Sequence, residues 1–133
     1  MKEFHLTFVI FILSQVCFSQ SKDSVKVELP DVEIKQLNGK TINAKDFSNE
    51  GKPFIVCFWK TCCKPPVEML ETISEVYEDW VDETEVVMYA VSIDDSRNSN
   101  KVAPFVNSRG WEYIVLLDVN SDFKRAMNVV IIP

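Results

Sequence analysis

Six consecutive apolar residues, Phe54 to Trp59, constrain the fold of this 133-residue chain more than any other feature. The run follows Gly-Lys-Pro and predicts a short β-strand buried on both faces, as in parallel sheets. After Pro65-Pro66 the apolar residues recur at steps of three and four, which predicts an amphipathic helix. A buried strand followed by such a helix begins a βαβ unit. The predicted helical stripe comprises Val67, Leu70, Ile73, Val76, Tyr77 and Trp80.

The rest of the chain continues this alternation. Asn38-Gly39 between extended segments 27–34 and 40–42 predicts a hairpin. Further predictions are a helical turn at 44–49, strands at 86–93 and 113–117, and helices at 100–108, before Gly110, and at 121–127, with Ser121 as the N-cap. The length suits one domain with its own core. We expect an α/β fold over residues 27–133, with an N-terminal hairpin, βαβ units and a mostly parallel central sheet.

The first 19 residues are predicted to be a signal peptide. Lys2 precedes an uncharged run at 6–13, and small residues precede a predicted cleavage site before Gln20. The run is far shorter than the roughly 20 residues that span a bilayer, so we expect no membrane span after cleavage. A lipoprotein acylated at Cys17 is a weaker alternative. We expect an exported, periplasmic or extracytoplasmic chain with a flexible lead-in at 20–26.

Charge and composition exclude several function classes. The net charge is −6 and the basic residues are scattered, which argues against a nucleic-acid partner. Cleavage would remove Cys17 and the only histidine, leaving Cys57, Cys62 and Cys63. This excludes Cys-His nucleophile pairs and histidine-containing zinc sites. An odd cysteine count leaves at least one thiol free or bonded to another molecule.

Cys63 is the candidate nucleophile because it lies where the strand joins the helix. A helix N-terminus, with Lys60 and Lys64 nearby, favours the thiolate, so we predict a lowered pKa for this thiol. The alternative is a small, half-buried apolar residue. We expect Asp94-Asp95, after a predicted strand, to be a solvated loop start rather than a catalytic carboxylate pair.

The segment 58–66 resembles the active site of the thioredoxin superfamily, in its exported TlpA/ResA-like branch, whose pattern is Phe-Trp-x-Thr-Trp-Cys-x-Pro-Cys. The chain departs at Cys62, where the branch has Trp, at Pro66, where it has the second Cys, and at Met69, where it often has Glu. The matching residues are Phe58, Trp59, Thr61, Cys63 and Pro65. Segments 38–40, 51–53, 91–94, 117–118 and 132–133 also fall where the branch has corresponding features.

The resemblance implies a thioredoxin-like fold and a thiol–disulfide oxidoreductase without a cofactor. The implied partners are exported protein thiols or disulfides and an external thiol reductant. The implied site comprises Cys63 as nucleophile, Pro133 at the cis-proline position, and Trp59, Pro65 and Ile132 against the substrate, although core packing would also explain Trp59.

The departures leave the activity open, because Pro66 cannot resolve a mixed disulfide. Cys62 could pair with Cys63 only through a strained ring. Cys57 is expected to be an inert core thiol. The three thiols would suit Cu(I), but adjacent cysteines rarely point at one ion, so we expect no metal.

Three hypotheses remain: exchange through Cys63 as a single thiol, a non-catalytic binding module, and a one-cysteine peroxidase. Peroxiredoxins separate the threonine and cysteine by two residues, whereas here one residue separates Thr61 from Cys63. A thioredoxin fold continues beyond its cis-proline with two strands and a helix, and this sequence ends at Pro133. We expect a fragment or truncated product with strand 54–59 on an exposed sheet edge. A degraded gene, or another chain pairing at that edge, are the alternatives.

Overall fold

The computed structural model describes residues 28–133, so the predicted signal peptide and lead-in lie outside the described residues. Its five-stranded sheet has the order β2-β1-β5-β4-β3. β3, β4 and β5 are parallel, and β1 is antiparallel to both β2 and β5. The predicted α/β class and mostly parallel central sheet are confirmed. The strands are β1 (Glu33–Gln36), β2 (Thr41–Asn43), β3 (Phe54–Trp59), β4 (Val87–Ser92) and β5 (Ile114–Leu117).

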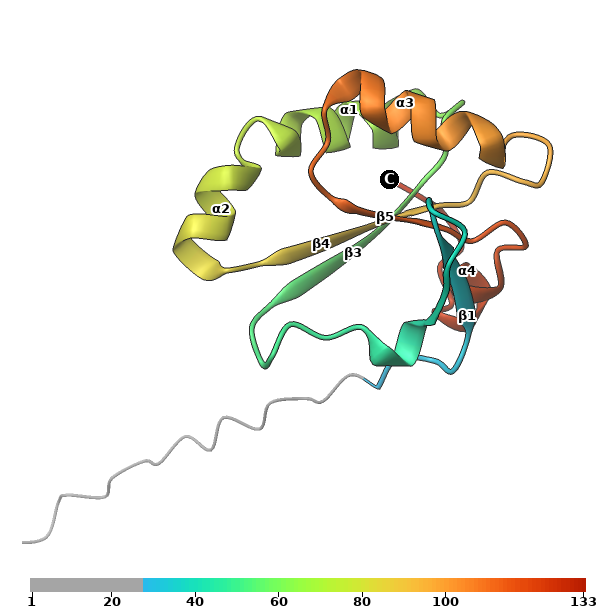
Figure 1. The fold of residues 1–133 in the computed structure, drawn as a ribbon, viewed down its shortest axis with the longest axis horizontal. Helices are drawn as coiled ribbons and strands as arrows, with labels where there is room; N and C mark the ends of the chain where they lie inside the picture. The colour runs from blue at the N-terminus through green and yellow to red at the C-terminus, as the bar shows by residue number, and fades with distance from the viewer. Residues whose placement is uncertain (1–27) are drawn as a thin grey trace, which may run out of the picture.

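Helices cover both faces of the sheet, as Figure 1 shows. One face packs under α1 and α3, and the other under α4 and the short helix η1. Neighbouring strand residues alternate between the faces, so that Trp59 points to the first cluster and Phe58 to the second. The helices are η1 (Ala44–Asp46), α1 (Lys64–Ser74), α2 (Tyr77–Thr84), η2 (Ser99–Lys101), α3 (Val102–Arg109) and α4 (Asp122–Ala126). No helix in residues 28–133 is long and apolar enough to cross a membrane.

The predicted hairpin is present, with Lys35 paired to Thr41. Gly39 has a φ of +84°, a conformation that glycine adopts without steric cost. The first strand begins at Glu33, later than the predicted extended segment 27–34. Pro30 precedes it and has no N–H group to donate to a sheet ladder. The Asn38-Gly39 turn therefore predicted the hairpin, whereas the first residue of its first strand was not predicted.

The predicted single helix after Pro66 is wrong, because the chain breaks between α1 and α2. The Tyr77 hydroxyl accepts a hydrogen bond from the backbone N–H of Met88 at 3.1 Å. The Tyr77 ring also packs edge-on against Tyr113, with ring centroids 4.9 Å apart. The break turns Tyr77 toward these partners and leaves Val76 and Trp80 38% and 37% exposed. Two tertiary contacts thus override the helical periodicity.

Ser121 holds the predicted N-cap position of α4, but its side chain does not cap the helix. Ser121 has a φ of +57° and makes no side-chain capping bond. Instead, the buried carboxylate of Asp118 accepts hydrogen bonds from the backbone N–H groups of Phe123 and Lys124, at 3.2 and 2.9 Å. A carboxylate makes stronger hydrogen bonds to N–H groups than a hydroxyl does. Asp118, the residue that follows β5, therefore caps the start of α4.

β3 lies at one end of the sheet, as predicted. It pairs with β4 from Phe54–Val87 to Trp59–Ser92, and no described strand pairs with its other side. Ile55 on this strand is 36% exposed, whereas Cys57 is buried. Within residues 28–133, β3 therefore presents an open edge of N–H and C=O groups.

Candidate active site

The site lies at the carboxyl end of the parallel strands, where ligands commonly bind in α/β folds. Trp59, Ser92 and Leu117 end their strands in register with one another. The backbone N–H of Ile93 donates to the Trp59 carbonyl oxygen at 2.9 Å. This alignment brings the loop after β3, which carries the adjacent cysteines, against the loop after β4.

Asp94 joins these two loops. Its carboxylate accepts hydrogen bonds from the Thr61 backbone N–H at 2.9 Å, the Thr61 hydroxyl at 2.6 Å and the Ser92 hydroxyl at 2.8 Å. The side chain is 1% exposed, so the prediction of a solvated loop start is wrong for Asp94. The sequence offered only a weak signal, two hydroxyl residues that could partner an acid after a strand. Because Thr61 donates its hydroxyl to Asp94, that hydroxyl is not directed at Cys63 as a peroxidase mechanism would need.

Cys63 is the N-cap of α1, with φ −102° and ψ 110°. Its carbonyl oxygen accepts from the Val67 N–H at 3.4 Å, but its thiol receives no capping bond. The N–H groups that bond an N-cap side chain belong to the second and third helical residues. Here those residues are Pro65 and Pro66, which have no N–H group. The helix start therefore offers the Cys63 thiolate much less stabilisation than the sequence argument assumed.

The two adjacent thiols lie side by side. The sulfur atoms of Cys62 and Cys63 are 3.6 Å apart, with Cys62 exposed and Cys63 half-buried. The pKa of the Cys63 thiol is raised, first by its hydrogen bond with Cys62 and then by partial burial. Lys60 lowers this pKa, as predicted, but its effect is smaller. The predicted net lowering is wrong, because the neighbouring thiol outweighs the lysine and two prolines occupy the helix start.

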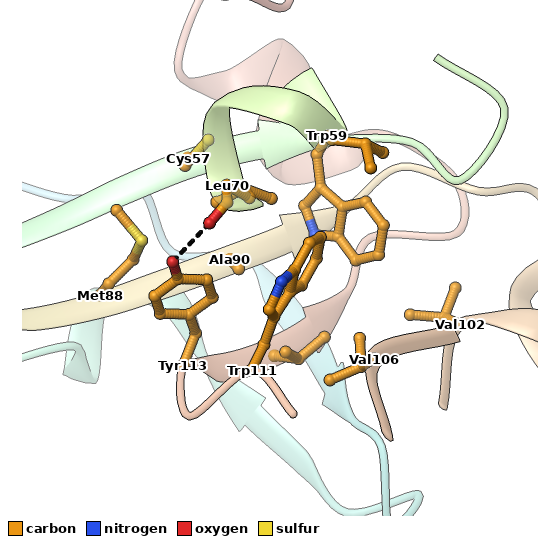
Figure 2. Close-up of a cluster of buried hydrophobic side chains, with 11 residues drawn as sticks. Cys57, Trp59, Leu70, Met88, Ala90, Val102, Val106, Trp111 and Tyr113 are labelled. Atoms are coloured by element: carbon orange, nitrogen blue, oxygen red, sulfur yellow. Dashed lines mark hydrogen bonds between the residues drawn. The ribbon is translucent and has the colours of Figure 1, made fainter. Parts of the chain in front are cut away.

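Cys57 and Trp59 lie in the buried cluster of Figure 2. Burial raises the pKa of the Cys57 thiol to about 11, in keeping with an inert core thiol. Trp59 is 0% exposed and packs against Phe105 and Trp111, with its ring centroid 5.6 Å and 5.3 Å from theirs respectively. Trp59 therefore has no surface to offer a substrate, and its geometry favours core packing over a substrate-binding role.

The prolines of the predicted site have different environments. Pro66 is fully buried at the position of the missing second cysteine, and Pro65 is exposed beside the thiols. Pro133, at the position of the family's cis-proline, is exposed, and no peptide bond in residues 28–133 is cis. A trans X–Pro bond is favoured by about 0.5–1 kcal/mol unless packing reverses it, and an exposed proline lacks such packing. Ile132 is half-buried against the cluster that includes Phe58.

A cleft of about 350 Å³ opens beside Cys62. The lysines Lys60 and Lys101 give it positive charge, and the Lys101 ammonium donates to the Asn98 side chain at 2.9 Å. Sequence reasoning missed Lys101 and Asn98, which lie far from the cysteines along the chain. Among the described residues, no three His, Cys, Asp or Glu side chains gather to hold a metal ion. The lining comprises Lys60, Thr61, Cys62, Asp94, Asn98, Lys101 and Phe105.

Fold and site together define a thioredoxin-like protein with a thiol at the strand-to-helix join. The model of the AhpC/TSA family matches residues 25–133. The chain belongs to this family, in its TlpA/ResA-like thioredoxin branch.

The thiol–disulfide oxidoreductase ResA of Bacillus cereus is 27% identical over 124 residues, which cover 92% of this chain and 69% of ResA. A thioredoxin-like protein from Porphyromonas gingivalis has a solved structure with 53% identity and a TM-score of 0.71, covering 80% of this chain and 69% of that one. A secreted disulfide oxidoreductase from Mycobacterium tuberculosis shares the fold, with 17% identity, a TM-score of 0.59 and coverage of 74% of this chain and 69% of that one.

Proposed function

We propose that this chain is an exported thiol–disulfide exchange protein that works through Cys63 as the one remaining thiol of the family motif. A single observation carries the proposal. Cys63 is only half-buried at the join of β3 and α1, while Pro66 is fully buried where the family has its second thiol. Chemistry that needs only one thiol therefore remains open to this site.

The exchange needs no cofactor. The Cys63 thiolate attacks one sulfur of a substrate disulfide, forming a mixed disulfide and releasing the other sulfur as a thiolate. An external thiol then attacks the mixed disulfide and frees Cys63, so that the substrate is reduced and the external thiol is oxidised. The raised pKa of Cys63 limits the thiolate fraction at neutral pH, although a thiolate of higher pKa is intrinsically more nucleophilic.

The substrate would be an exported protein, which could contact two parts of the surface. Pro65 is exposed beside the thiols and offers an apolar contact. The resemblance to the family makes Ile132 and Pro133 further candidate contacts. The open edge of β3 could pair with an extended substrate segment or with a second chain. Trp59 cannot contact the substrate, because its side chain is fully buried.

Export rests on the N-terminal sequence, with cleavage before Gln20. The secreted structural neighbour from Mycobacterium tuberculosis is in keeping with such a location. The intact mass of the chain recovered outside the cytoplasm tests this part. A chain beginning at Gln20 is expected, and a chain that keeps residues 1–19 would contradict cleavage.

Reduction of a disulfide-bonded model protein by glutathione tests the activity. The wild-type chain is expected to accelerate the reduction, and Cys63→Ser should return it to the uncatalysed rate. Pro66→Cys should raise the rate further, because it restores a resolving thiol. Pro66→Ala is the matched control, since it removes the same proline without adding a thiol. A wild-type rate equal to that of Cys63→Ser would contradict the proposal.

The second candidate is a thioredoxin-fold binding module without catalysis. The raised pKa of Cys63 and the two prolines at the start of α1 favour it, because both reduce the supply of thiolate. This candidate predicts that wild-type and Cys63→Ser chains bind a partner equally well. Loss of partner capture in Cys63→Ser would exclude it.

A further inference from the structure

Cys62, which stands where the family has a tryptophan, lies close to the proposed nucleophile Cys63. The sulfur atoms of Cys62 and Cys63 are 3.6 Å apart in the reduced chain, close to van der Waals contact. Both residues precede the first turn of α1, and the Cys63 N–H donates to the Lys60 carbonyl oxygen at 3.1 Å in the preceding turn, so neither N–H group takes part in the helix. Bringing the two sulfurs to bonding distance requires side-chain rotation and some distortion of the backbone between them.

No other thiol of residues 28–133 is placed to attack a mixed disulfide on Cys63. Cys57 is buried beneath α1 in the first core cluster, and its pKa of about 11 leaves almost no thiolate at neutral pH. Pro66 occupies the usual position of the second thiol. Cys62 is exposed and lines the cleft with Lys60 and Lys101, so solvent and small thiols can reach it.

We propose that Cys62 is the resolving thiol of this site and closes a transient disulfide with its neighbour Cys63. The proposal rests on the function proposed above, since Cys63 must first carry a mixed disulfide. The Cys62 thiolate attacks the Cys63 sulfur, the bond between Cys63 and the substrate breaks, and the substrate leaves as a thiolate. The two cysteines lose two electrons and two protons overall, and the substrate disulfide gains them.

The strain of such a ring suits a transient species. Consecutive Cα atoms lie about 3.8 Å apart, whereas disulfides usually join Cα atoms about 4.4–6.8 Å apart. Strained, exposed disulfides are more easily reduced than structural ones. A small thiol entering the cleft beside Cys62 would reopen the ring and return both cysteines to the reduced state. The lysines of the cleft favour a thiol that carries carboxylates.

Stoichiometric reaction with 4,4′-dithiodipyridine, a neutral disulfide, tests the proposal. Reduced wild-type chain receives one equivalent of the reagent, and released thiopyridone and intact mass are followed together. We expect two thiopyridones per reagent, with the protein losing two hydrogen atoms and keeping no adduct. Cys62→Ser should release one thiopyridone and keep the adduct on Cys63 at least about ten times longer. Because Cys62 is exposed, this substitution leaves the core unchanged.

Trypsin cleavage after Lys60 separates Cys57 from the adjacent pair and locates the disulfide. A disulfide within the fragment that carries Cys62 and Cys63 supports the proposal. A wild-type adduct as long-lived as that of Cys62→Ser, or a disulfide to Cys57, would overturn it while leaving Cys63 as the nucleophile. If Cys63→Ser forms adducts as fast as wild type, or if Cys63 does not react, the proposed function fails and this inference fails with it.

Discussion

The Asp94 carboxylate accepts two hydrogen bonds from Thr61, one from the backbone N–H at 2.9 Å and one from the hydroxyl at 2.6 Å. The residues are 33 positions apart in the sequence, and their contact fixes the loop that carries Cys62 and Cys63. The carboxylate is fully enclosed, so these hydrogen bonds have little competition from water. The position of both thiols thus depends on a side chain outside the motif.

Asp94→Ala is expected to lower the free energy of unfolding by about 1–3 kcal/mol, because it leaves buried donors of Thr61 and Ser92 without an acceptor. Urea unfolding measures the change. Asp82→Ala removes an exposed carboxylate on α2 and should stay within about 0.5 kcal/mol of wild type. Equal effects of the two substitutions would show that Asp94 does not anchor the loop.

Pro66→Ala is expected to lower the pKa of the Cys63 thiol. The substitution restores a backbone N–H at the third position of α1, where it can donate to the thiolate, and such a bond is worth about 1.5–3 kcal/mol. The pH dependence of Cys63 alkylation measures this pKa. Below the pKa, a lower value means more thiolate and therefore faster alkylation at a given pH.

Pro53→Ala, at the residue before β3, is the control, because it removes a proline far from the helix start. It should leave the alkylation profile of Cys63 unchanged. An unchanged profile in Pro66→Ala would show that the missing N–H group does not determine the behaviour of this thiol.

Cys57 is expected to make stability fall in alkaline solution. Its pKa is about 11 in the folded chain and 9.0 for an unperturbed thiol. Below pH 9 the thiol is protonated in both states, so its contribution to stability is fully present. As the pH rises toward 11, the unfolded chain releases the proton first, and up to about 3 kcal/mol is lost.

Urea unfolding from pH 8 to about pH 11 measures this loss. Cys57→Ala should begin less stable, because it opens a cavity, but should show a correspondingly shallower decline with pH. Parallel declines in the two proteins would assign the alkaline loss to other groups.

The lysines of the cleft are expected to select anionic reagents. Lys60→Gln combined with Lys101→Gln should slow the reaction of the cysteine pair with dianionic 5,5′-dithiobis(2-nitrobenzoate) by roughly three- to tenfold. The reaction with neutral 4,4′-dithiodipyridine should change much less, and added salt should reduce the difference. Stopped-flow absorbance measures both rates.

Lys64→Gln is the matched control, since Lys64 does not line the cleft and pairs with Glu68 at 3.1 Å. It should have a smaller effect on the dianionic reagent than the double substitution. An equal effect would mean that general charge, not the cleft, controls the approach of anions.

Local sequence signals predicted the elements whose conformation depends on their own residues. The apolar run Phe54–Trp59 forms β3 with the predicted bounds. Gly39 makes the predicted turn, and Gly110 ends α3 in the left-handed conformation. In each case the structure follows from the residues themselves. An apolar run is driven to be buried, and glycine adopts a positive φ without steric cost.

The features that escaped prediction depend on partners distant in sequence. The break before α2 follows the contacts of Tyr77 with Met88 and Tyr113, which the helical period does not report. The burial of Asp94 depends on donors supplied by Thr61 and Ser92. The behaviour of Cys63 was misjudged for a different reason. The sequence showed the prolines after it, but a helix start stabilises a thiolate only where N–H groups are present.

The rate of mixed-disulfide formation at each cysteine shows directly whether Cys63 is the nucleophile. The reduced chain is mixed with a disulfide-bonded protein, quenched in acid at successive times and digested, and the adduct on each cysteine is measured by mass. We predict that Cys63 carries the first adduct, that Cys63→Ser abolishes it, and that Cys57 stays unmodified while the chain is folded. First adducts on Cys62, formed at an unchanged rate in Cys63→Ser, would contradict the assignment of Cys63 as the nucleophile.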